Sequence, residues 1–308
     1  MDVLVSGSSG LIGSALREAL RDAGHLPVRL VRPSSPREGD TVLWEPKEGR
    51  IEGGALEGVQ AVAHLAGEPV IGRWTDRKKR RIRASRVAGT RLLAETLAGL
   101  QRPPAVMLSA SGIHWYGSRG EEVLTEESSP GPGFLAEVVR EWEAATGPAE
   151  AAGIRVIHLR TAPVLSTEGG LLAAQLLPFR LGLGAKLGSG RQWMSWIALE
   201  DHVGAMLYLL NRPDARGPVN LTSPNPVRNV TFARTLGRVL GRPVFLTVPK
   251  FAVELVLGAD AAEEFAFSST RVLPARLVDE FAFRFRHPGL EEALRAVLER
   301  PKHGRGQS

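Results

Sequence analysis

The sequence predicts an α/β protein with a doubly wound parallel sheet and a smaller C-terminal domain. The first 32 residues alternate strand, helix and strand, and strand-like apolar runs separated by helical stretches continue as far as Arg160. After Arg160 this alternation stops, and Gly and Pro accumulate in segments such as 181–190. We therefore expect a Rossmann domain over residues 1–165, to which residues 196–222 return, and a smaller substrate-binding part over residues 166–308.

Composition narrows the functional classes. The 308 residues include no cysteine, which excludes disulfides, thiolate metal sites and a thiol nucleophile and favours a reducing cytoplasm. The net charge of +6 favours anionic ligands. Aromatic residues make up only 6% and no nucleic-acid-binding motif occurs, so we expect no nucleic-acid partner. No apolar run approaches the roughly 18 residues of a membrane span, so we expect no membrane partner either.

The N-terminal residues form the clearest unit. An apolar strand at Val3–Val5 leads through a glycine-rich turn into a helix, which Gly24 ends as a C-terminal cap. A second strand at Pro27–Arg32 completes a βαβ unit. The inward stripe of the helix, at spacings of three and four, consists of Ile12, Leu16, Leu20 and Ala23.

The later helices and strands are predicted from shorter segments of the sequence. A helix is expected from Trp196 to about Leu210, and Pro218–Leu221 is expected to return a strand to the main sheet. The polar tail Lys302–Ser308 is expected to fray. Further strands of the main sheet are predicted at Ala61–Leu65, Ala105–Ser109 and Ile154–Arg160.

The turn after the first strand has the pattern GxxGxxG. Gly7 permits the tight turn, Gly10 lets the backbone approach a pyrophosphate, and Gly13 lets the helix pack closely on the strand. The start of the helix adds free N–H donors and a positive dipole. An ordinary glycine-rich βα turn is the alternative, but the βαβ context favours a dinucleotide site. Its expected contacts are Gly7, Ser9, Gly10, Leu11, Ile12 and Gly13.

The end of the second strand distinguishes NAD from NADP. An NAD site usually places an acidic residue there, which accepts a hydrogen bond from the ribose 2′-hydroxyl. The segment Arg29–Ser35 contains no acid. We expect Arg32, helped by Ser34 or Arg29, to meet the 2′-phosphate of NADP(H), and the alternative is that Arg32 is a solvated loop residue.

Five landmarks in order resemble the extended short-chain dehydrogenase/reductase superfamily. They are the segments Val3–Gly13, Ala61–Gly67, Gly89–Thr90, Leu108–Ser111 with Tyr116–Gly117, and Leu159–Arg160. Narrower matches resemble its atypical SDR39U1-like, or sugar-nucleotide epimerase-like, branch, in which the substrate and reaction are largely unassigned. These are the segments Glu68–Pro69, Ile82–Arg86, Gly188–Ile197, Pro218–Pro226 and Phe283–Leu290.

The resemblance implies further contacts with the cofactor. Leu65, Ala66 and Gly67 follow a strand that borders the cofactor crevice in this superfamily. Arg86 shares an inward helix stripe with Gly89, so its side chain is expected to point toward that crevice. The resemblance also implies cofactor contacts by Ser109 and Arg160.

The departures from the superfamily concern its chemistry. The superfamily's general acid/base pair is a Tyr with a Lys four residues later, and the corresponding segment here is Phe134–Val138, with neither residue. Loss of a positioned acid/base typically costs about 10²–10⁴ in rate. Arg86 stands where an Asn is usual, and Met194 stands where an Arg commonly clamps a substrate diphosphate. Arg191 is the nearest replacement for that Arg.

Three residues are candidates for the missing proton transfer. Ser111 lies at the carboxyl end of a predicted central strand, and Tyr116 follows on the same loop. Glu68 follows another strand end. The alternatives are that Tyr116 packs the loop and that Glu68 is a helix-capping or salt-bridged acid. The imidazole of His114, between Ser111 and Tyr116, is also available to donate or take a proton, and the favoured alternative is that His114 is a surface loop histidine.

Cations and aromatic residues from both parts of the chain are expected to line one substrate pocket, which suits a carboxylate or phosphate with an apolar body. The histidine spacing predicts no metal site. A homodimer through the helices that flank the sheet is expected by analogy. The residues expected to line the pocket are Arg73, Trp74, Arg191, Trp193 and Trp196.

Two functional hypotheses follow. The first is an NADP(H)-dependent oxidoreductase or epimerase-like enzyme that acts on an anionic or sugar-like small molecule without the Tyr/Lys pair. The second is a non-enzymatic NADP(H)-binding redox sensor or scaffold. The polar, Arg- and Trp-rich second part favours the enzyme, because a sensor has little need of a substrate domain.

Overall fold

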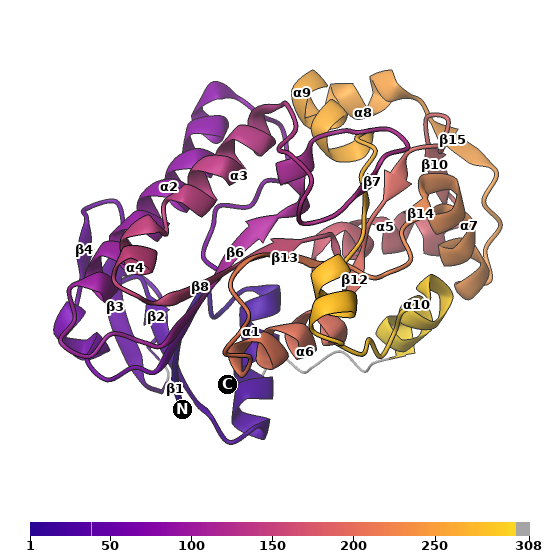
Figure 1. Ribbon diagram of the computed structural model, residues 1–308. Coiled ribbons are helices and arrows are strands. Elements are labelled where there is room, and N and C mark those ends of the chain that lie inside the picture. The colour runs from indigo at the N-terminus through magenta and orange to yellow at the C-terminus, as the bar shows by residue number, and fades with distance from the viewer. Residues whose placement is uncertain (38, 300–308) are drawn as a thin grey trace.

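A computed structural model describes residues 1–37 and 39–299, so the predicted frayed tail Lys302–Ser308 lies outside the described residues. Within the described ranges, eight strands form one sheet in the order β13-β8-β6-β5-β1-β2-β3-β4 (Figure 1). Neighbours are parallel except β3 and β4. The strands are β1 (Asp2–Ser6), β2 (Leu26–Val31), β3 (Thr41–Glu45), β4 (Arg50–Ile51), β5 (Ala61–His64), β6 (Val106–Gly112), β8 (Arg155–Thr161) and β13 (Gly217–Leu221).

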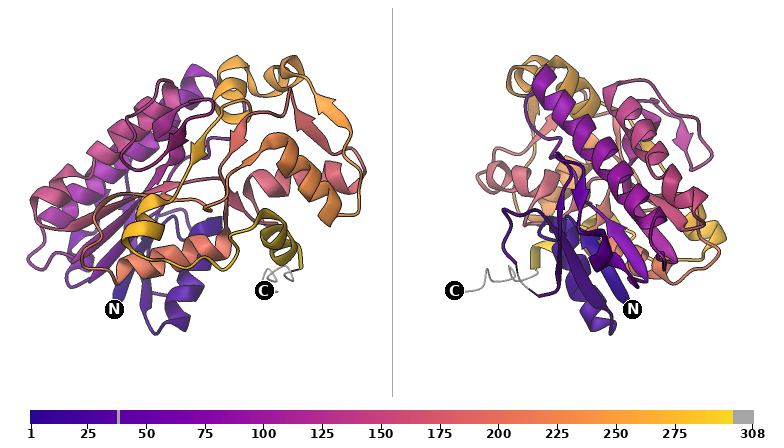
Figure 2. Two further views of the ribbon diagram at one scale, coloured as in Figure 1. Left: turned by 45° about the vertical axis from the view of Figure 1, so that its right-hand side comes forward. Right: turned by 90° about the vertical axis from the view of Figure 1, so that its left-hand side faces the viewer.

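Helices cover both faces of this sheet (Figure 2). Side chains alternate across β1, so Val3 and Val5 belong to the core under one helical layer and Leu4 to the core under the other. One layer consists of α1 (Leu11–Asp22) and α6 (Leu199–Leu210). The other consists of α2 (Asp76–Ala98), α3 (Phe134–Ala144) and α4 (Gly147–Ala151). The doubly wound parallel sheet predicted from the sequence is therefore present.

The strand predicted at residues 218–221 is β13, which pairs in parallel with β8. Two strands that the sequence did not predict, β3 and β4, extend the other edge of the sheet. Val42 and Trp44 of β3 are buried while their neighbours are partly exposed, which is the alternation of a strand covered on one face. The segment is short and lies among charged residues, which hides that alternation in the sequence.

The C-terminal part has its own hydrophobic core, in which Trp196 and Phe232 are among the buried residues. That core draws on α5 (Gly170–Arg180), α7 (Asn229–Val239) and α10 (Leu290–Glu299). Short strand pairs link its segments: β9 (Val164–Leu165) with β12 (Ile197–Ala198), β10 (Ala185–Leu187) with β15 (Leu246–Val248), and β11 (Trp193–Met194) with β14 (Val227–Arg228).

The end of this part folds back toward the sheet. There β16 (Arg271–Val272) pairs with β7 (Val123–Leu124), which joins residues far apart in the chain. The remaining short helices are η1 (Gly53–Leu56), η2 (Ile113–Tyr116), α8 (Lys250–Leu257), α9 (Ala259–Ala261), η3 (Ala262–Ala266) and η4 (Arg276–Glu280). Within the described residues, no helix combines the length and apolar character that crossing a membrane requires.

Candidate functional site

The turn between β1 and α1 has the geometry of a phosphate-binding turn. Gly7 has a φ of +64°, and a Cβ there would come within 2.8 Å of the Leu65 carbonyl carbon. A Cβ on Gly13 would lie 2.2 Å from the Gly7 oxygen, so only glycine permits this close approach. Gly10 begins α1 without a side-chain cap, so the first helical amides are left for a ligand. Around this turn lie all the residues expected to meet a pyrophosphate: Gly7, Ser9, Gly10, Leu11, Ile12 and Gly13.

Ser6 joins the end of β1 to the segment after β5. Its Oγ accepts hydrogen bonds from the amides of Leu65 at 3.0 Å and Ala66 at 3.2 Å, and pairs with His64 Nδ1 at 2.7 Å. Burial lowers the pKa of His64 to about 4, so the ring is neutral at pH 7. Because Ser6 already accepts two amides and donates its own proton to Nδ1, the ring proton lies on Nε2 and is donated to Thr90 Oγ1 at 2.9 Å.

The two arginines of the β2 segment are placed differently. Arg29 is buried, and its Nε donates to Ser8 Oγ at 3.3 Å, so it supports the glycine turn from behind. Arg32 is exposed just beyond the end of β2. Within residues 1–37 and 39–299, no hydrogen bond or ion pair holds the Arg32 guanidinium, and Ser34 beside it is also exposed.

Arg86 projects from α2 toward the carboxyl end of β5. Its Nη1 donates to the Glu68 carbonyl oxygen at 2.9 Å, and its Cζ lies 3.4 Å from the position of a Cβ on Gly67. The guanidinium lies 5.0 Å from the ring centre of Trp142. Burial lowers the pKa of Arg86 to about 10, against the attraction of Glu68, so the side chain is still a cation at neutral pH.

The Glu68 carboxylate is engaged by basic residues of α2. Lys78 Nζ donates to Oε1 at 3.0 Å, and Arg81 pairs with the same oxygen. Burial acts to raise the pKa of Glu68, but the hydrogen bonds and charges of Lys78 and Arg81 outweigh it, and the net pKa lies below its usual range. A carboxylate held in this way is a weak base, so the salt-bridged alternative describes Glu68.

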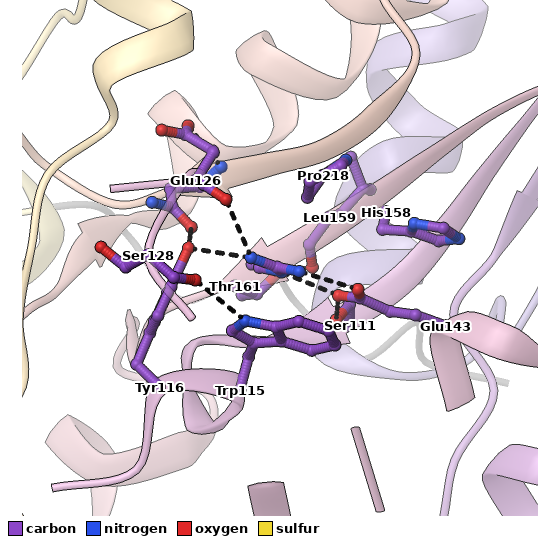
Figure 3. Close-up of polar contacts among 12 residues, drawn as sticks. Ser111, Trp115, Tyr116, Glu126, Ser128, Glu143, His158, Leu159, Thr161 and Pro218 are labelled. Carbon is purple, nitrogen blue, oxygen red and sulfur yellow. Dashed lines mark hydrogen bonds and ion pairs between the residues drawn. The ribbon is translucent and has the colours of Figure 1, made fainter. Parts of the chain in front are cut away.

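Arg160 and Glu143 form the centre of a buried network, and Figure 3 shows Glu143 with Ser111, Trp115 and Tyr116 around it. Arg160 Nε and Nη2 donate to the two Glu143 carboxylate oxygens at 2.9 Å each. Ser111 Oγ donates to Glu143 Oε1 at 2.6 Å, and the Trp115 ring covers the guanidinium at 3.9 Å. Arg160 is 2% exposed and Glu143 8%, so both charges are neutralised inside the protein.

Tyr116 extends this network toward β13. Its hydroxyl donates to Asn220 Oδ1 at 2.7 Å and accepts from Arg160 Nη1 at 3.1 Å. The backbone N–H of Asn220 in turn donates to Glu126 Oε1 at 2.9 Å. Tyr116 is 0% exposed, and burial raises its pKa to about 12, against the pull of Arg160 and Asn220.

These positions bear on the expected roles of three residues, which stay predictions. Ser111 and Tyr116 were expected to exchange protons with a substrate, and Arg160 was expected to contact the cofactor. All three side chains are buried, and their polar atoms are paired with one another or with Glu143 and Asn220. In this arrangement the three side chains are engaged within the protein. Ser109, earlier on β6, is also buried, and its Oγ has no hydrogen-bond partner within the described chain.

The start of α3 is capped by the C-terminal part. The amides of Phe134 and Leu135 donate to the two carboxylate oxygens of Glu264 at 2.8 Å each. The next residue, Phe265, stacks on His114 with ring centres 5.5 Å apart and planes at 24°. His114 was expected at the surface, but it is half-buried because Phe265 covers one face of its ring. Burial, followed by the charge of Arg86, lowers the pKa of His114 to about 4.

The five residues expected to line one pocket do not gather in one place. Trp74 packs edge-on against Phe134 at 5.4 Å, and Arg73 Nη1 donates to the Leu255 oxygen. Trp193 lies in a separate cluster. Trp196 is 1% exposed, and its Nε1 donates to the Asn225 oxygen in the C-terminal core, so it cannot line an open pocket.

The Trp193 cluster lies near β11 and β14. The Trp193 ring lies between the guanidiniums of Arg228 at 4.2 Å and Arg271 at 4.4 Å, and its Nε1 donates to Glu121. The exposed Arg191 gives its carbonyl oxygen to Arg228. Cationic and aromatic groups are therefore present, but at a different place from Trp74.

A cavity of about 290 Å³ lies beside the outer face of α1. It includes Leu11 and Glu18 of α1, the segment 165–168 and the start of α6, and so borders the phosphate turn. Across the described ranges, no group of three or more His, Asp or Glu side chains is arranged to hold a metal ion.

Sequence reasoning missed several residues that organise the site. Glu143 is the ion-pair partner of Arg160, and Asn220 is the hydrogen-bond partner of Tyr116. In each pair the two residues come from different elements. Glu264 and Phe265, from the C-terminal part, contact Phe134 and His114. Thr90, quoted only as part of a landmark, accepts from both His64 and Trp142. Their local sequence carries no signal of these contacts, because each contact depends on how distant elements pack.

Known proteins resemble this chain over nearly its whole length. Residues 3–221 match the NAD dependent epimerase/dehydratase family, and residues 248–297 match a domain of unknown function, DUF1731. The epimerase family protein MT2273 of Mycobacterium tuberculosis is 41% identical over 300 residues, covering 97% of this chain and 98% of that protein.

Solved structures give the same result. The crystal structure of human epimerase family protein SDR39U1 (isoform 2) with NADPH has a TM-score of 0.90 at 31% identity, covering 97% of this chain and 99% of that one. The nucleoside-diphosphate sugar epimerase from Corynebacterium glutamicum has a TM-score of 0.78 at 36% identity, covering 96% of this chain and 57% of that one.

Proposed function

Because the chain belongs to the SDR39U1-like branch of the NAD dependent epimerase/dehydratase family, we propose that it is an NADP(H)-binding oxidoreductase or epimerase-like enzyme. Its substrate in this proposal is an anionic or sugar-like small molecule. The observation that carries the proposal is the uncapped start of α1, where glycines at 7 and 13 bring free helical amides to the carboxyl ends of β1 and β5. The strand order of the sheet reverses between these two strands, β1 and β5.

The preference for NADP(H) rests on Arg32. Its guanidinium is exposed and free of other described partners at the end of β2, where no acidic residue competes. A charge-assisted contact with a 2′-phosphate is worth about 1.5–3 kcal/mol, or roughly ten- to a hundredfold in affinity. The human relative was crystallised with NADPH, which supports the same choice.

The chemistry has to proceed without the superfamily's Tyr/Lys pair. We place the corresponding segment at the start of α3, where Phe134 and Val138 contribute only apolar side chains. When bound, NADPH supplies a hydride. The protein then has to hold a substrate carbon, manage one proton and exclude water.

Calorimetry on the purified protein tests the cofactor proposal. We expect NADPH to bind about ten- to a hundredfold more tightly than NADH. Arg32→Gln is expected to remove that difference by weakening NADPH alone. Arg37→Gln is the matched control, because Arg37 is exposed on the same loop. If neither dinucleotide binds to folded protein, the proposal is wrong.

A non-enzymatic NADP(H) sensor is the second candidate. It is supported by the burial of Ser111 and Tyr116, whose hydroxyls are hydrogen-bonded within the protein. A sensor predicts tight NADPH binding with no turnover of any carbonyl compound, whereas the enzyme predicts substrate-dependent oxidation of NADPH. The expected homodimer is a separate proposal, which sedimentation of the purified protein tests.

A further inference from the structure

His114 differs from the other histidines whose structure is described. Each of the others has a ring nitrogen in a hydrogen bond: His25, His64, His158, His202 and His287. Within residues 1–37 and 39–299, neither nitrogen of His114 has such a partner, and neither is a fully buried atom. One face of the ring stacks on Phe265, and the residue as a whole is half-buried. The ring is therefore fixed in orientation and free to bond a ligand.

His114 and Arg32 lie on opposite sides of β1 and β5 along the carboxyl ends of the strands. If Arg32 at the end of β2 takes the 2′-phosphate of the adenosine half, the nicotinamide half extends the other way along the sheet edge, over β5 and β6. His114 follows directly after β6. Arg86 borders the end of β5 beside Gly67, and β5 is the strand next to β6.

We propose that His114 is the proton-transfer residue of this site and that Arg86 holds an anionic group of the substrate, so that the substrate is a small carbonyl compound, or its alcohol, bearing a carboxylate or phosphate. This inference rests on the proposed function. It replaces the roles expected for Ser111, Tyr116 and Glu68, whose polar atoms are already engaged.

The two ring nitrogens of His114, neither of which is engaged by a described residue, allow a balanced proton step. In reduction, the substrate carbon gains a hydride from NADPH, and the carbonyl oxygen needs one proton. A neutral imidazole would donate its N–H to that oxygen while its other nitrogen takes up one proton from a hydronium ion of the solvent, so that the reduction consumes one solvent proton and the ring ends neutral as the other tautomer. In oxidation the same steps run backwards, and the proton leaves to water. A neutral ring that polarises a carbonyl is an established catalytic device.

Arg86 is suited to select the anionic group. Its Nη1 is engaged with the oxygens of Glu68 and Ile82, which fixes the guanidinium. Its Nε and Nη2 donors have no hydrogen bond to the described residues and are not fully buried. Because the ring of Trp142 lies on one side, those donors can form a fork for a planar carboxylate or a phosphate.

Histidine labelling tests the placement without a substrate. The protein is treated with diethyl pyrocarbonate at pH 6, with and without NADPH, and the modified peptides are identified by mass spectrometry. We expect His114 to be labelled and to be protected by NADPH. His25, far from the crevice, is the control that is labelled equally in both cases, and the buried His64 is the control that is not labelled. An unlabelled His114, or one that NADPH leaves unprotected, overturns the inference.

A substrate panel tests the chemistry. Pyruvate and glyceraldehyde 3-phosphate are compared with methyl pyruvate and glyceraldehyde, and NADPH oxidation is followed. We expect the charged members to be favoured, and Arg86→Gln to remove an advantage of about ten- to a hundredfold. His114→Gln is expected to lower kcat by about 10²–10⁴ and to leave KM and NADPH affinity unchanged. His25→Gln is the matched control.

The outcomes separate this inference from the proposal on which it rests. If calorimetry shows no NADPH binding, the proposed function itself is wrong. If NADPH binds but no member of the panel is reduced, or if His114→Gln keeps wild-type kcat, only the assignment of His114 fails. An unchanged preference for charged members in Arg86→Gln overturns the role given to Arg86.

Discussion

Arg160 and Glu143 meet as a two-pronged ion pair inside the protein, 2.9 Å apart at both contacts, between β8 and α3. Such a pair stabilises little relative to apolar packing, but the removal of one partner leaves a buried charge without compensation. Water cannot hydrate the Arg160 guanidinium in place of Glu143, because the side chain is buried and the Trp115 ring covers it.

Glu143→Gln is therefore expected to lower the free energy of unfolding by about 3–5 kcal/mol. The control is Glu141→Gln on the same helix, whose carboxylate pairs at the surface with Arg83 and should cost at most about 1 kcal/mol. Urea unfolding of the three proteins measures both effects. Equal costs for the two variants would contradict a buried, uncompensated Arg160.

Gly13→Ala is expected to disrupt the start of α1. The added Cβ would lie 2.2 Å from the Gly7 oxygen, which only a shift of the backbone can relieve. We expect the free energy of unfolding to fall by about 1–3 kcal/mol. We also expect NADPH affinity to fall, because the turn that would bind the phosphates has to move. Gly54→Ala is the control, because a Cβ there meets nothing within 4 Å. Thermal unfolding and calorimetry check the pair.

His64 is expected to make stability depend on pH. Burial holds its pKa at about 4 in the folded protein, against 6.5 for a free imidazole. Between these values the unfolded chain binds a proton that the folded chain does not, so the contribution is complete above pH 6.5 and is lost as the pH falls toward 4. The slope approaches about 1.4 kcal/mol per pH unit within that window.

Urea unfolding at several pH values measures this slope. His64→Gln is expected to be less stable at pH 7 but to lose less stability on acidification than the wild type does. The comparison isolates His64 from the other groups that titrate in the same range. Parallel curves for the two proteins would show that His64 does not carry the effect.

Glu264→Ala is expected to loosen the start of α3. Both carboxylate oxygens accept amides there, at 2.8 Å, and the loss of such a cap costs about 0.5–2 kcal/mol. Hydrogen exchange should accelerate at the amides of Phe134 and Leu135 in particular. Glu263→Ala is the neighbouring control, since that carboxylate pairs with Lys250 at the surface. If exchange is unchanged at both amides, Glu264 does not act as the cap.

The N-terminal half of the fold could be predicted from sequence because its signals are local. The apolar run at β1, the stripe of α1 and the glycines between them need no knowledge of distant residues. The strand β3 was missed because its buried positions, Val42 and Trp44, alternate over only five residues. Trp193 and Trp196 show the limit well. They stand three residues apart, yet one lies between two arginines and the other lies in a hydrophobic core.

The candidate site was predictable only in part. The phosphate turn follows from its glycines, and Arg86 could be directed to the crevice from the period of its helix. The role of Tyr116 could not be judged, because its burial depends on Asn220, 104 positions away. The stacking of His114 on Phe265 joins two halves of the chain that no local pattern connects.

The hydroxyl oxygen of Ser6 accepts hydrogen bonds from the backbone amides of Leu65 and Ala66. The segment after β5 is therefore anchored by the protein's own contacts. Binding should cost little conformational entropy in the protein, and most of the affinity gained from the phosphates should appear as net binding free energy. In Ser6→Ala the amides of Leu65 and Ala66 would lose this anchor and would have to be ordered when the dinucleotide binds. The affinity for the dinucleotide should then fall while the protein stays folded.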